Sequence, residues 1–219
     1  VLELVKEAHA QGVRALVFPE LCLTGATCGD LLRQGVLLDA AEAALRRIAS
    51  ESTFFDPLFV LGLPLRAAGK LFSCAAVLHR GEILAVVPKR AHDRWFSLPP
   101  AGETPETAFG PLAPSALFPV DGVPVGVCFS PDDPLPAADV LLMLRADPAL
   151  VGHADARRDA ALQLTKRLGC ALVCASAGDG ESTTDFVFGA QDLIACNGKL
   201  LAERRFESGL LAAEFDAAA

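Results

Sequence analysis

Positive charge is scarce in this sequence. Among its 219 residues, 19 lysines and arginines stand against 27 aspartates and glutamates, so the formal net charge is -8 at pH 7. Nucleic-acid binding needs a basic stripe that neutralises phosphates, and adjacent basic residues here occur only in pairs, such as Arg157 with Arg158 and Arg204 with Arg205. The composition therefore argues against a nucleic-acid partner.

Other features that would assign a function class are also missing. No run of about 18 apolar residues is present to span a membrane, and the first residues lack the order of a secretion signal. The four histidines are scattered and the seven cysteines include no C-x-x-C pair, which argues against a metal site. An odd number of cysteines without paired spacing is typical of a reducing compartment, so we expect a soluble, cytoplasmic protein.

The hydrophobic pattern alternates between helical and strand periods. Hydrophobic residues make up 52% of the chain, enough for a large core, so we expect a single domain over residues 1–219. Helices are predicted over Val1–Gln11, Gly29–Ile48 and Asp155–Leu168. Strands are predicted over Ala15–Phe18, Leu58–Leu63, Leu71–Leu78, Glu82–Val87, Ala116–Val120, Val123–Cys128, Val140–Leu144, Ala171–Ala175, Gln191–Ala195 and Lys199–Phe206. This order predicts an α/β fold of mixed sheets with helices outside them.

Two segments carry no regular period. Leu98–Pro114 is rich in proline and small residues and is interpreted as a surface excursion near the site, either a plain connecting loop or a lid. Gly178–Thr184 is interpreted as a turn. Its Glu181 either hydrogen-bonds across a subunit boundary or belongs to a loop whose polar side chains satisfy their own backbone.

Three short sequence motifs at predicted strand ends each supply a reactive group. PEL provides the carboxylate of Glu20, VPK the ammonium of Lys89 and VGVC the thiol of Cys128. The end of a strand is where an α/β fold presents chemistry, because the strand fixes the backbone and the following loop aims the side chain. We therefore expect the three side chains to converge on one site.

These three groups suit nucleophilic attack on a carbonyl or nitrile carbon. A thiol is mostly protonated at neutral pH, so Cys128 needs a base such as Glu20 to take its proton, or a cation such as Lys89 to favour its thiolate. Lys89 would also stabilise an oxyanion. Each residue alone has an ordinary alternative: an inert buried thiol, a turn or helix cap at Glu20, and a solvated strand end at Lys89.

The motifs around these residues follow one another in a characteristic order: FPELCLTG, CGDLL, VLGLPLR, LFSCAAVL, GEILAVVPK, SAGDGESTTDFVFG and NGKLLAERRFESGLLAAEFD. Together they resemble the nitrilase, or carbon-nitrogen hydrolase, superfamily. They resemble in particular the N-terminal glutamine amidotransferase domain of glutamine-dependent NAD synthetases, from about Leu2 to Asp216. SAGDGESTTDFVFG is the most specific of these motifs.

The resemblance implies a four-layer α-β-β-α sandwich whose first strand is missing from this chain. It implies that Glu20 is the base, Lys89 the oxyanion-stabilising lysine and Cys128 the nucleophile of a triad that hydrolyses the glutamine side-chain amide through a thioester. No cofactor is implied for that step, whereas ATP and Mg would belong to a synthetase domain that is absent from these residues. A homo-oligomer is also expected.

Several positions depart from the pattern of the family. Phe129 stands where an acidic residue is usual after the nucleophile, and Ala26 replaces a usual tyrosine in a chain that has no tyrosine. The expected serine-rich word after the strand at Val140–Leu144 is replaced by a stretch that begins with Arg145. A carboxylate for the amino group of the substrate is therefore missing, and Phe129 and Arg145 are candidate substrate contacts.

The loop after Lys89 is also short. Only Arg90–Asp93 separate Lys89 from the RWF motif that begins at Arg94. The family carries a longer loop with a second glutamate at this place, and here His92 or Asp93 occupies that region. Trp95 is a third candidate substrate contact, with simple packing as its alternative.

Three functions stay open at this point. The first is a glutamine amidohydrolase that supplies ammonia to an NAD synthetase. The second is a catalytically weak or inactive assembly domain that binds a synthetase partner or its own copies. The third is a free-standing amidase of another small amide.

Overall fold

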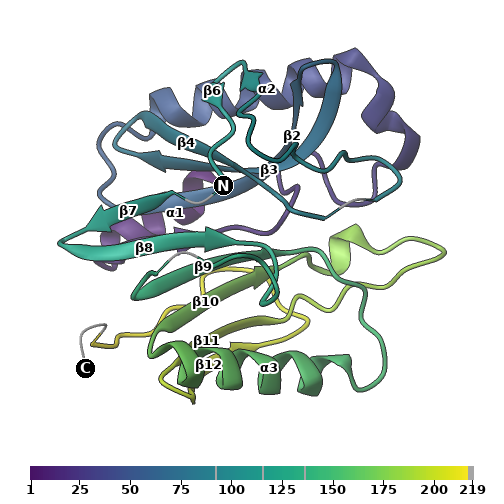
Figure 1. The fold of residues 1–219 in the computed structure, drawn as a ribbon. Helices are drawn as coiled ribbons and strands as arrows, with labels where there is room; N and C mark the ends of the chain where they lie inside the picture. Colours follow the sequence, from purple (N-terminus) through teal and green to yellow (C-terminus); the bar gives the residue numbers. More distant parts are fainter. Residues whose placement is uncertain (92, 115, 136, 217–219) are drawn as a thin grey trace.

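Two β-sheets face each other in the part of the chain that the computed structural model describes, residues 1–91, 93–114, 116–135 and 137–216 (Figure 1). The four-stranded sheet has the order β1-β2-β3-β4, formed by β1 (Ala15–Val17), β2 (Leu58–Ala67), β3 (Lys70–His79) and β4 (Glu82–Pro88). The six-stranded sheet has the order β12-β11-β10-β9-β8-β7, formed by β7 (Leu117–Val120), β8 (Val123–Cys128), β9 (Val140–Arg145), β10 (Ala171–Ser176), β11 (Asp192–Cys196) and β12 (Lys199–Arg204). The predicted mixed α/β class is confirmed.

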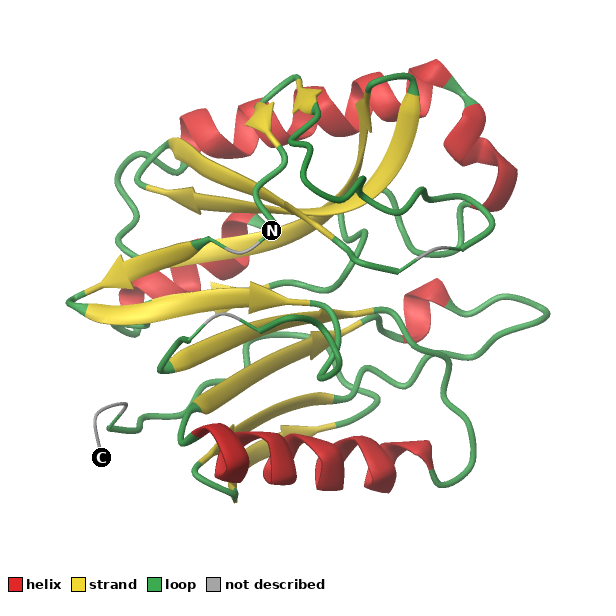
Figure 2. Cartoon of the chain, in the orientation of Figure 1, coloured by secondary structure: helices red, strands yellow, loops and turns green. Residues whose placement is uncertain are grey.

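Helices cover the outer face of each sheet. The helices α1 (Leu2–Ala10) and α2 (Gly35–Glu51) contribute Val5 and Leu45 to an apolar cluster with Phe59 of β2. The helix α3 (His153–Leu168) contributes Leu164 to another cluster with Leu141 of β9. Figures 1 and 2 show α2 above the four-stranded sheet and α3 below the six-stranded one. Each helix thus buries an apolar face that would otherwise be in water.

The third cluster lies between the sheets. Side chains alternate along a strand, and Val125 and Val127 of β8 face the four-stranded sheet, where they join Val60 and Val77. Cys128, one residue later, belongs instead to the cluster with α3. The strand period therefore decides which side of the sheet each candidate residue faces.

Two predicted elements differ from the structure. The expected helix over Gly29–Ile48 is divided into a 3-10 helix, η1 (Gly29–Arg33), and α2, because Gln34 between them is extended (φ -89°, ψ 122°). The strand expected to stop at Pro64 continues to Ala67. Proline is tolerated there because β1 pairs with β2 only as far as Val60, which leaves the proline nitrogen at a free edge.

The expected loop at Leu98–Pro114 carries a short hairpin, β5 (Glu106–Thr107) with β6 (Gly110–Pro111). Its end is anchored rather than free, because Leu112 is buried in the outer cluster and the Ala113 N–H donates to the Val86 C=O at 2.8 Å. Within the described ranges, no helix is long and apolar enough to cross a membrane.

Candidate functional site

Glu20 lies in the turn that follows β1, at the junction of the two sheets. The Phe18 N–H donates to the Val60 C=O at 2.8 Å, which keeps the chain along β2 after β1 has ended. The Glu20 N–H then donates to the Arg145 C=O at 3.3 Å, at the end of β9 in the other sheet. Glu20 is only 5% exposed. The turn therefore holds a carboxylate inside the molecule, where it needs partners.

A glycine in β2 makes room for this turn. A Cβ atom built on Gly62 would lie 2.7 Å from the Glu20 Cα and closer still to the Leu21 nitrogen. The Gly62 C=O also accepts the Leu23 N–H at 3.2 Å. Leu21 itself has a φ of 57°, unusual for leucine, and its buried side chain packs with Leu32 and Phe96. Close packing on Gly62 thus fixes the position of Glu20.

The Glu20 carboxylate accepts three hydrogen bonds. The Lys89 Nζ donates to both oxygens, at 2.9 and 2.8 Å, and the Ser73 Oγ donates to Oε1 at 2.8 Å. Lys89 follows β4, and its side chain is 28% exposed, against 6% for that of Glu20. A buried carboxylate held by an ammonium and a hydroxyl can stay charged and keep a fixed geometry.

Ser73 was not identified from the sequence. It is 2% exposed on β3, and its C=O also accepts the Lys89 N–H at 2.8 Å, so it contacts both members of the pair. Counting back from the turn at Arg80 and Gly81 would place Pro88 opposite Ser73, but a bulge between Val77 and Leu78 shifts the register by one residue. Ser73 could have been found only with knowledge of that bulge.

Cys128 lies at the end of β8 with its side chain on the α3 side of the six-stranded sheet. It is 2% exposed and packs in the cluster that contains Met143 and Leu164. Burial raises the pKa of the Cys128 thiol well above its ordinary value, and the nearby Asp133 carboxylate raises the pKa further. Among the described residues, Cys128 forms no hydrogen bond with Glu20 or Lys89. The structure pairs Glu20 with Lys89, and it places the Cys128 thiol in the cluster on the α3 side.

The candidate substrate contacts lie in three different settings. Phe129 is 4% exposed in the core between the sheets, where its N–H donates to an Asp133 carboxylate oxygen at 2.8 Å. Arg145 forms an ion pair with Asp147, while its C=O accepts the Glu20 N–H. Trp95 packs on the cluster that contains Leu21. Arg145 is therefore beside Glu20, Phe129 is a core residue, and His92 lies outside the described residues.

Glu181 connects the two sheets at the same end of the molecule. It lies in a short 3-10 helix, η2 (Asp179–Glu181), and its Oε2 accepts the Ala26 N–H at 2.8 Å and the Thr27 Oγ1 hydrogen at 3.1 Å. The sequence did not decide which partners Glu181 would have. In the structure these hydrogen bonds are made within this chain, to the loop that follows Glu20.

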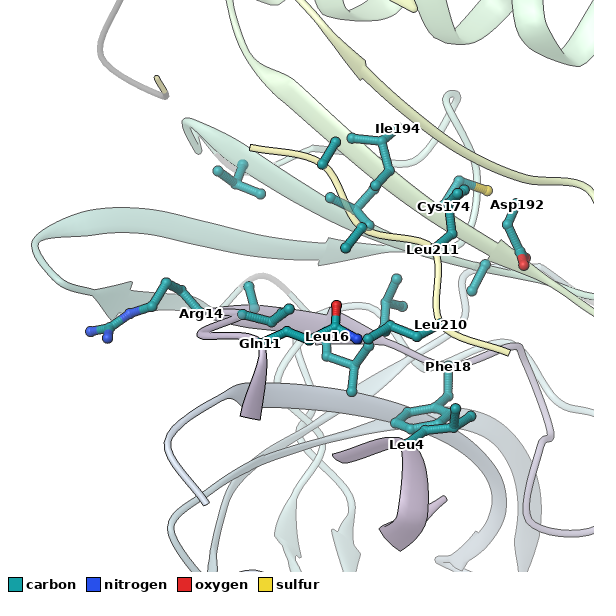
Figure 3. A pocket seen from close by; sticks show the side chains of 18 of the residues that line it. Leu4, Gln11, Arg14, Leu16, Phe18, Cys174, Asp192, Ile194, Leu210 and Leu211 are labelled. Carbon is teal, nitrogen blue, oxygen red and sulfur yellow. The ribbon is translucent and has the colours of Figure 1, made fainter. Parts of the chain in front are cut away.

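A large cavity lies elsewhere in the molecule. It measures about 820 Å³ and opens between the two sheets beside β1, and Figure 3 shows Leu16 and Phe18 on one side with Ile194 and Leu211 on the other. The lining of this cavity, as far as the structure describes it, does not include Glu20, Lys89 or Cys128. No group of three or more His, Cys, Asp or Glu side chains in the described ranges is arranged to hold a metal ion.

Comparison with known proteins gives a consistent family. A family model described as carbon-nitrogen hydrolase matches residues 1–131. The glutamine-dependent NAD(+) synthetase of Mycobacterium tuberculosis H37Rv is 37% identical over 238 residues, which cover 96% of this chain and 35% of the relative. That of Xylella fastidiosa Temecula1 is 28% identical over 205 residues, 85% of this chain and 35% of the relative. The chain thus spans about a third of the length of these relatives.

Solved structures share the fold. A glutamine-dependent NAD(+) synthetase from Cytophaga hutchinsonii has a TM-score of 0.81 at 25% identity, covering 93% of this chain and 37% of that one. An amidase from Nesterenkonia sp. AN1 has a TM-score of 0.76 at 20% identity, covering 98% of this chain and 85% of that one. The nitrilase-type fold is therefore shown across nearly the whole chain. Since the family model also matches more than half of its residues, this chain belongs to the carbon-nitrogen hydrolase family, a family of hydrolases.

Proposed function

We propose that this chain is a glutamine amidohydrolase domain that releases ammonia for an NAD synthetase. One observation carries the proposal: a buried carboxylate, Glu20, is held by Lys89 and Ser73 at the junction of the sheets. Burying a charge costs free energy unless hydrogen-bond and ion-pair partners offset the cost, and buried charged pairs are common at functional sites. The names of the mycobacterial and Cytophaga relatives, which include glutamine dependence, support glutamine as the substrate.

The chemistry would proceed in two steps. Glu20 accepts the Cys128 proton as the sulfur attacks the amide carbon, and Lys89 donates a hydrogen bond to the oxyanion. The tetrahedral intermediate expels ammonia, which takes the proton from Glu20, and leaves a thioester. Glu20 then accepts a proton from water, whose oxygen attacks the thioester, and the acid is released as the thiol regains a proton. The amidase from Nesterenkonia sp., whose description names an acrylamide adduct at the active-site cysteine, supports a thiol nucleophile.

This mechanism requires the Cys128 thiol to form a hydrogen bond with Glu20, which it does not form among the described residues. In the structure, the strand period directs the thiol to the α3 side, and Asp133 accepts the N–H groups of Phe129 and Ser130 at 2.8 and 2.9 Å. Release of these two bonds would free the end of β8 to rotate. We therefore propose that the described conformation is a resting one, with a protonated thiol.

The partners follow from the same proposal. The ammonia would pass to a synthetase domain, where ATP and Mg would be used, and no cofactor serves the amidase step. We propose one domain over residues 1–219, assembled as a homo-oligomer in the reducing cytoplasm, where its seven free cysteines would stay reduced.

One observation favours a second candidate, a catalytically silent assembly domain. Cys128 is buried in the cluster with α3, it has no hydrogen bond to the Glu20–Lys89 pair among the described residues, and the apolar Phe129 follows it. In such a domain, Glu20, Lys89 and Ser73 would serve only to join β1, β3 and β4.

Ammonia release decides between the candidates. The purified chain is given glutamine or propionamide, and Cys128→Ala is compared with Cys174→Ala, a matched loss of another buried thiol in the same cluster. The proposal expects weak release that Cys128→Ala abolishes and Cys174→Ala keeps. Weak release is expected because a substrate group without its partner costs about 1–3 kcal/mol. No release from either amide would support the silent domain.

A further inference from the structure

A second cavity, of about 480 Å³, lies on the outer side of the four-stranded sheet, between η1, α2 and the β2–β3 turn. Its apolar lining is formed by Leu32, Leu38, Leu71 and Trp95, and its charged lining by Arg33, Arg66, Lys70 and Arg94. Every charged side chain that lines it is basic, in a chain whose net charge is -8. Among the described residues, Glu20, Lys89 and Cys128 do not belong to its wall.

Most of this positive charge is not neutralised within the chain. Arg66 is paired, with Asp39 at 2.6 Å and Glu42 at 2.9 Å. Arg33, Lys70 and Arg94 form no ion pair with any residue that the structure describes. The nearby Asp93 uses its Oδ1 to accept the backbone N–H groups of Trp95 and Phe96 at 2.6 and 2.7 Å. Three of the four lining cations therefore have no carboxylate partner among the described residues, and the Oδ1 of the neighbouring Asp93 is already engaged.

Trp95 holds two of these cations in place. The guanidinium carbons of Arg33 and Arg94 lie 5.3 and 4.8 Å from the centre of the Trp95 ring, within the range of cation–π attraction. The ring itself packs against the buried Leu21, Leu32 and Phe96. The cations are thus partly ordered before any ligand arrives, which lowers the entropy lost on binding.

We propose that this cavity binds a phosphate monoester that carries an apolar or aromatic group. Arginine forks and a lysine ammonium match the oxygens of a dianionic phosphate, and the leucine floor suits the apolar group. Ligand pockets usually measure about 300–1,000 Å³. The cavity is of that size, which favours a small molecule over an acidic segment of another protein.

The test uses phenyl phosphate as the probe and the intact chain as the receptor. Trp95 is the only tryptophan of a chain without tyrosine, so its fluorescence reports on this cavity alone, and calorimetry gives the dissociation constant. Lys70→Ala removes one cation without touching the Arg–Trp contacts. Lys199→Ala is a matched control, because Lys70 and Lys199 each begin the second strand of a hairpin.

The proposal expects saturable binding that shifts Trp95 fluorescence, weakens at least tenfold in Lys70→Ala and is unchanged in Lys199→Ala. Inorganic phosphate should compete but bind more weakly, because it lacks the apolar group, and added salt should weaken both. Three results would overturn the proposal: no saturation, equal loss in the two lysine variants, or a glutamate-rich peptide that binds at least as tightly as phenyl phosphate.

Discussion

At the scale of single residues, the Glu20 carboxylate depends on its partners. It is nearly fully buried and accepts hydrogen bonds from Lys89 and Ser73. Loss of the Lys89 ammonium would leave the buried Glu20 charge without compensation. Loss of the Glu20 carboxylate would cost less, because the Lys89 side chain is partly exposed and its charge can be solvated by water. The two partners should therefore contribute unequally to stability.

A double-mutant cycle measures this coupling. Lys89→Met should lower the free energy of unfolding by about 1–3 kcal/mol, because a buried carboxylate loses its cation. Glu20→Gln combined with Lys89→Met should cost less than the sum of the single changes, with a coupling of about 1–2 kcal/mol. Urea unfolding of the four proteins gives the values. Simple additivity would mean that the pair is not coupled in solution.

The buried thiols predict the behaviour at alkaline pH. Burial raises the pKa of Cys22 and Cys174 from 9.0 to about 12, and it raises the pKa of Cys74 and Cys128 as well. Above pH 9.0 the unfolded chain ionises while the folded chain does not, so stability present below that pH is lost between about pH 9 and 12.

The loss should be about 1.4 kcal/mol per pH unit for each such thiol. Urea unfolding at pH 8, 9 and 10 measures how the free energy of unfolding falls with pH. Cys74→Ala should make this fall less steep by the contribution of one thiol. The same slope in wild type and variant would show that Cys74 does not titrate as its burial requires.

At the scale of elements, Gly62 is the point where β2 admits the turn that carries Glu20. Gly62→Ala should lower stability by about 1–3 kcal/mol, because the new Cβ overlaps the backbone of Glu20 and Leu21. Gly35→Ala is the matched control. It lies in the first turn of α2 with open space around it, so it should be neutral or slightly stabilising. Equal effects in urea unfolding would contradict the close packing at Gly62.

Most elements could be predicted from sequence because their signals are local. Apolar runs bounded by glycine turns gave β3, β4, β11 and β12, and the helical period gave α1 and α3. Non-local features escaped: the break at Gln34, the bulge that places Ser73 opposite Lys89, and the continuation of β2 past Pro64. Each depends on which strand or helix lies alongside, which a local pattern does not contain.

The candidate site shows the same limit. The convergence of Glu20 and Lys89 is expected because each residue follows a strand, but β1 and β4 lie at opposite edges of one sheet, so no local signal shows that the two side chains pair. Val127 and Cys128 are neighbours in β8, so their side chains face opposite sides of the sheet. Which of the two faces the other sheet depends on how the two sheets pack, and the local sequence does not contain that information.

At the scale of the whole molecule, an apolar surface lies on the loops after β9 and β10. Leu150, Val151, Phe186 and Val187 are each more than half exposed, and the Ala149 N–H donates to the Val187 C=O at 2.6 Å, which joins the two loops. Large exposed apolar patches of this kind commonly mark interfaces.

Light scattering at micromolar concentration should therefore give a mass above that of the 22.9 kDa monomer. Phe186→Lys should lower it toward the monomer, because a charge would be buried in the interface. Phe54→Lys changes an isolated exposed phenylalanine on the α2 side and should leave the mass unchanged. A monomer mass for wild type would contradict the proposed homo-oligomer.

The most direct test of the central claim is to trap the covalent intermediate. The chain is mixed with glutamine or propionamide, quenched with acid during turnover, digested and examined by mass spectrometry. The proposed mechanism predicts an acyl group on Cys128, absent in Lys89→Met, because the oxyanion then loses its donor. Unmodified Cys128 during measurable ammonia release, or acylation spread equally over Cys28 and Cys196, would contradict Cys128 as the nucleophile.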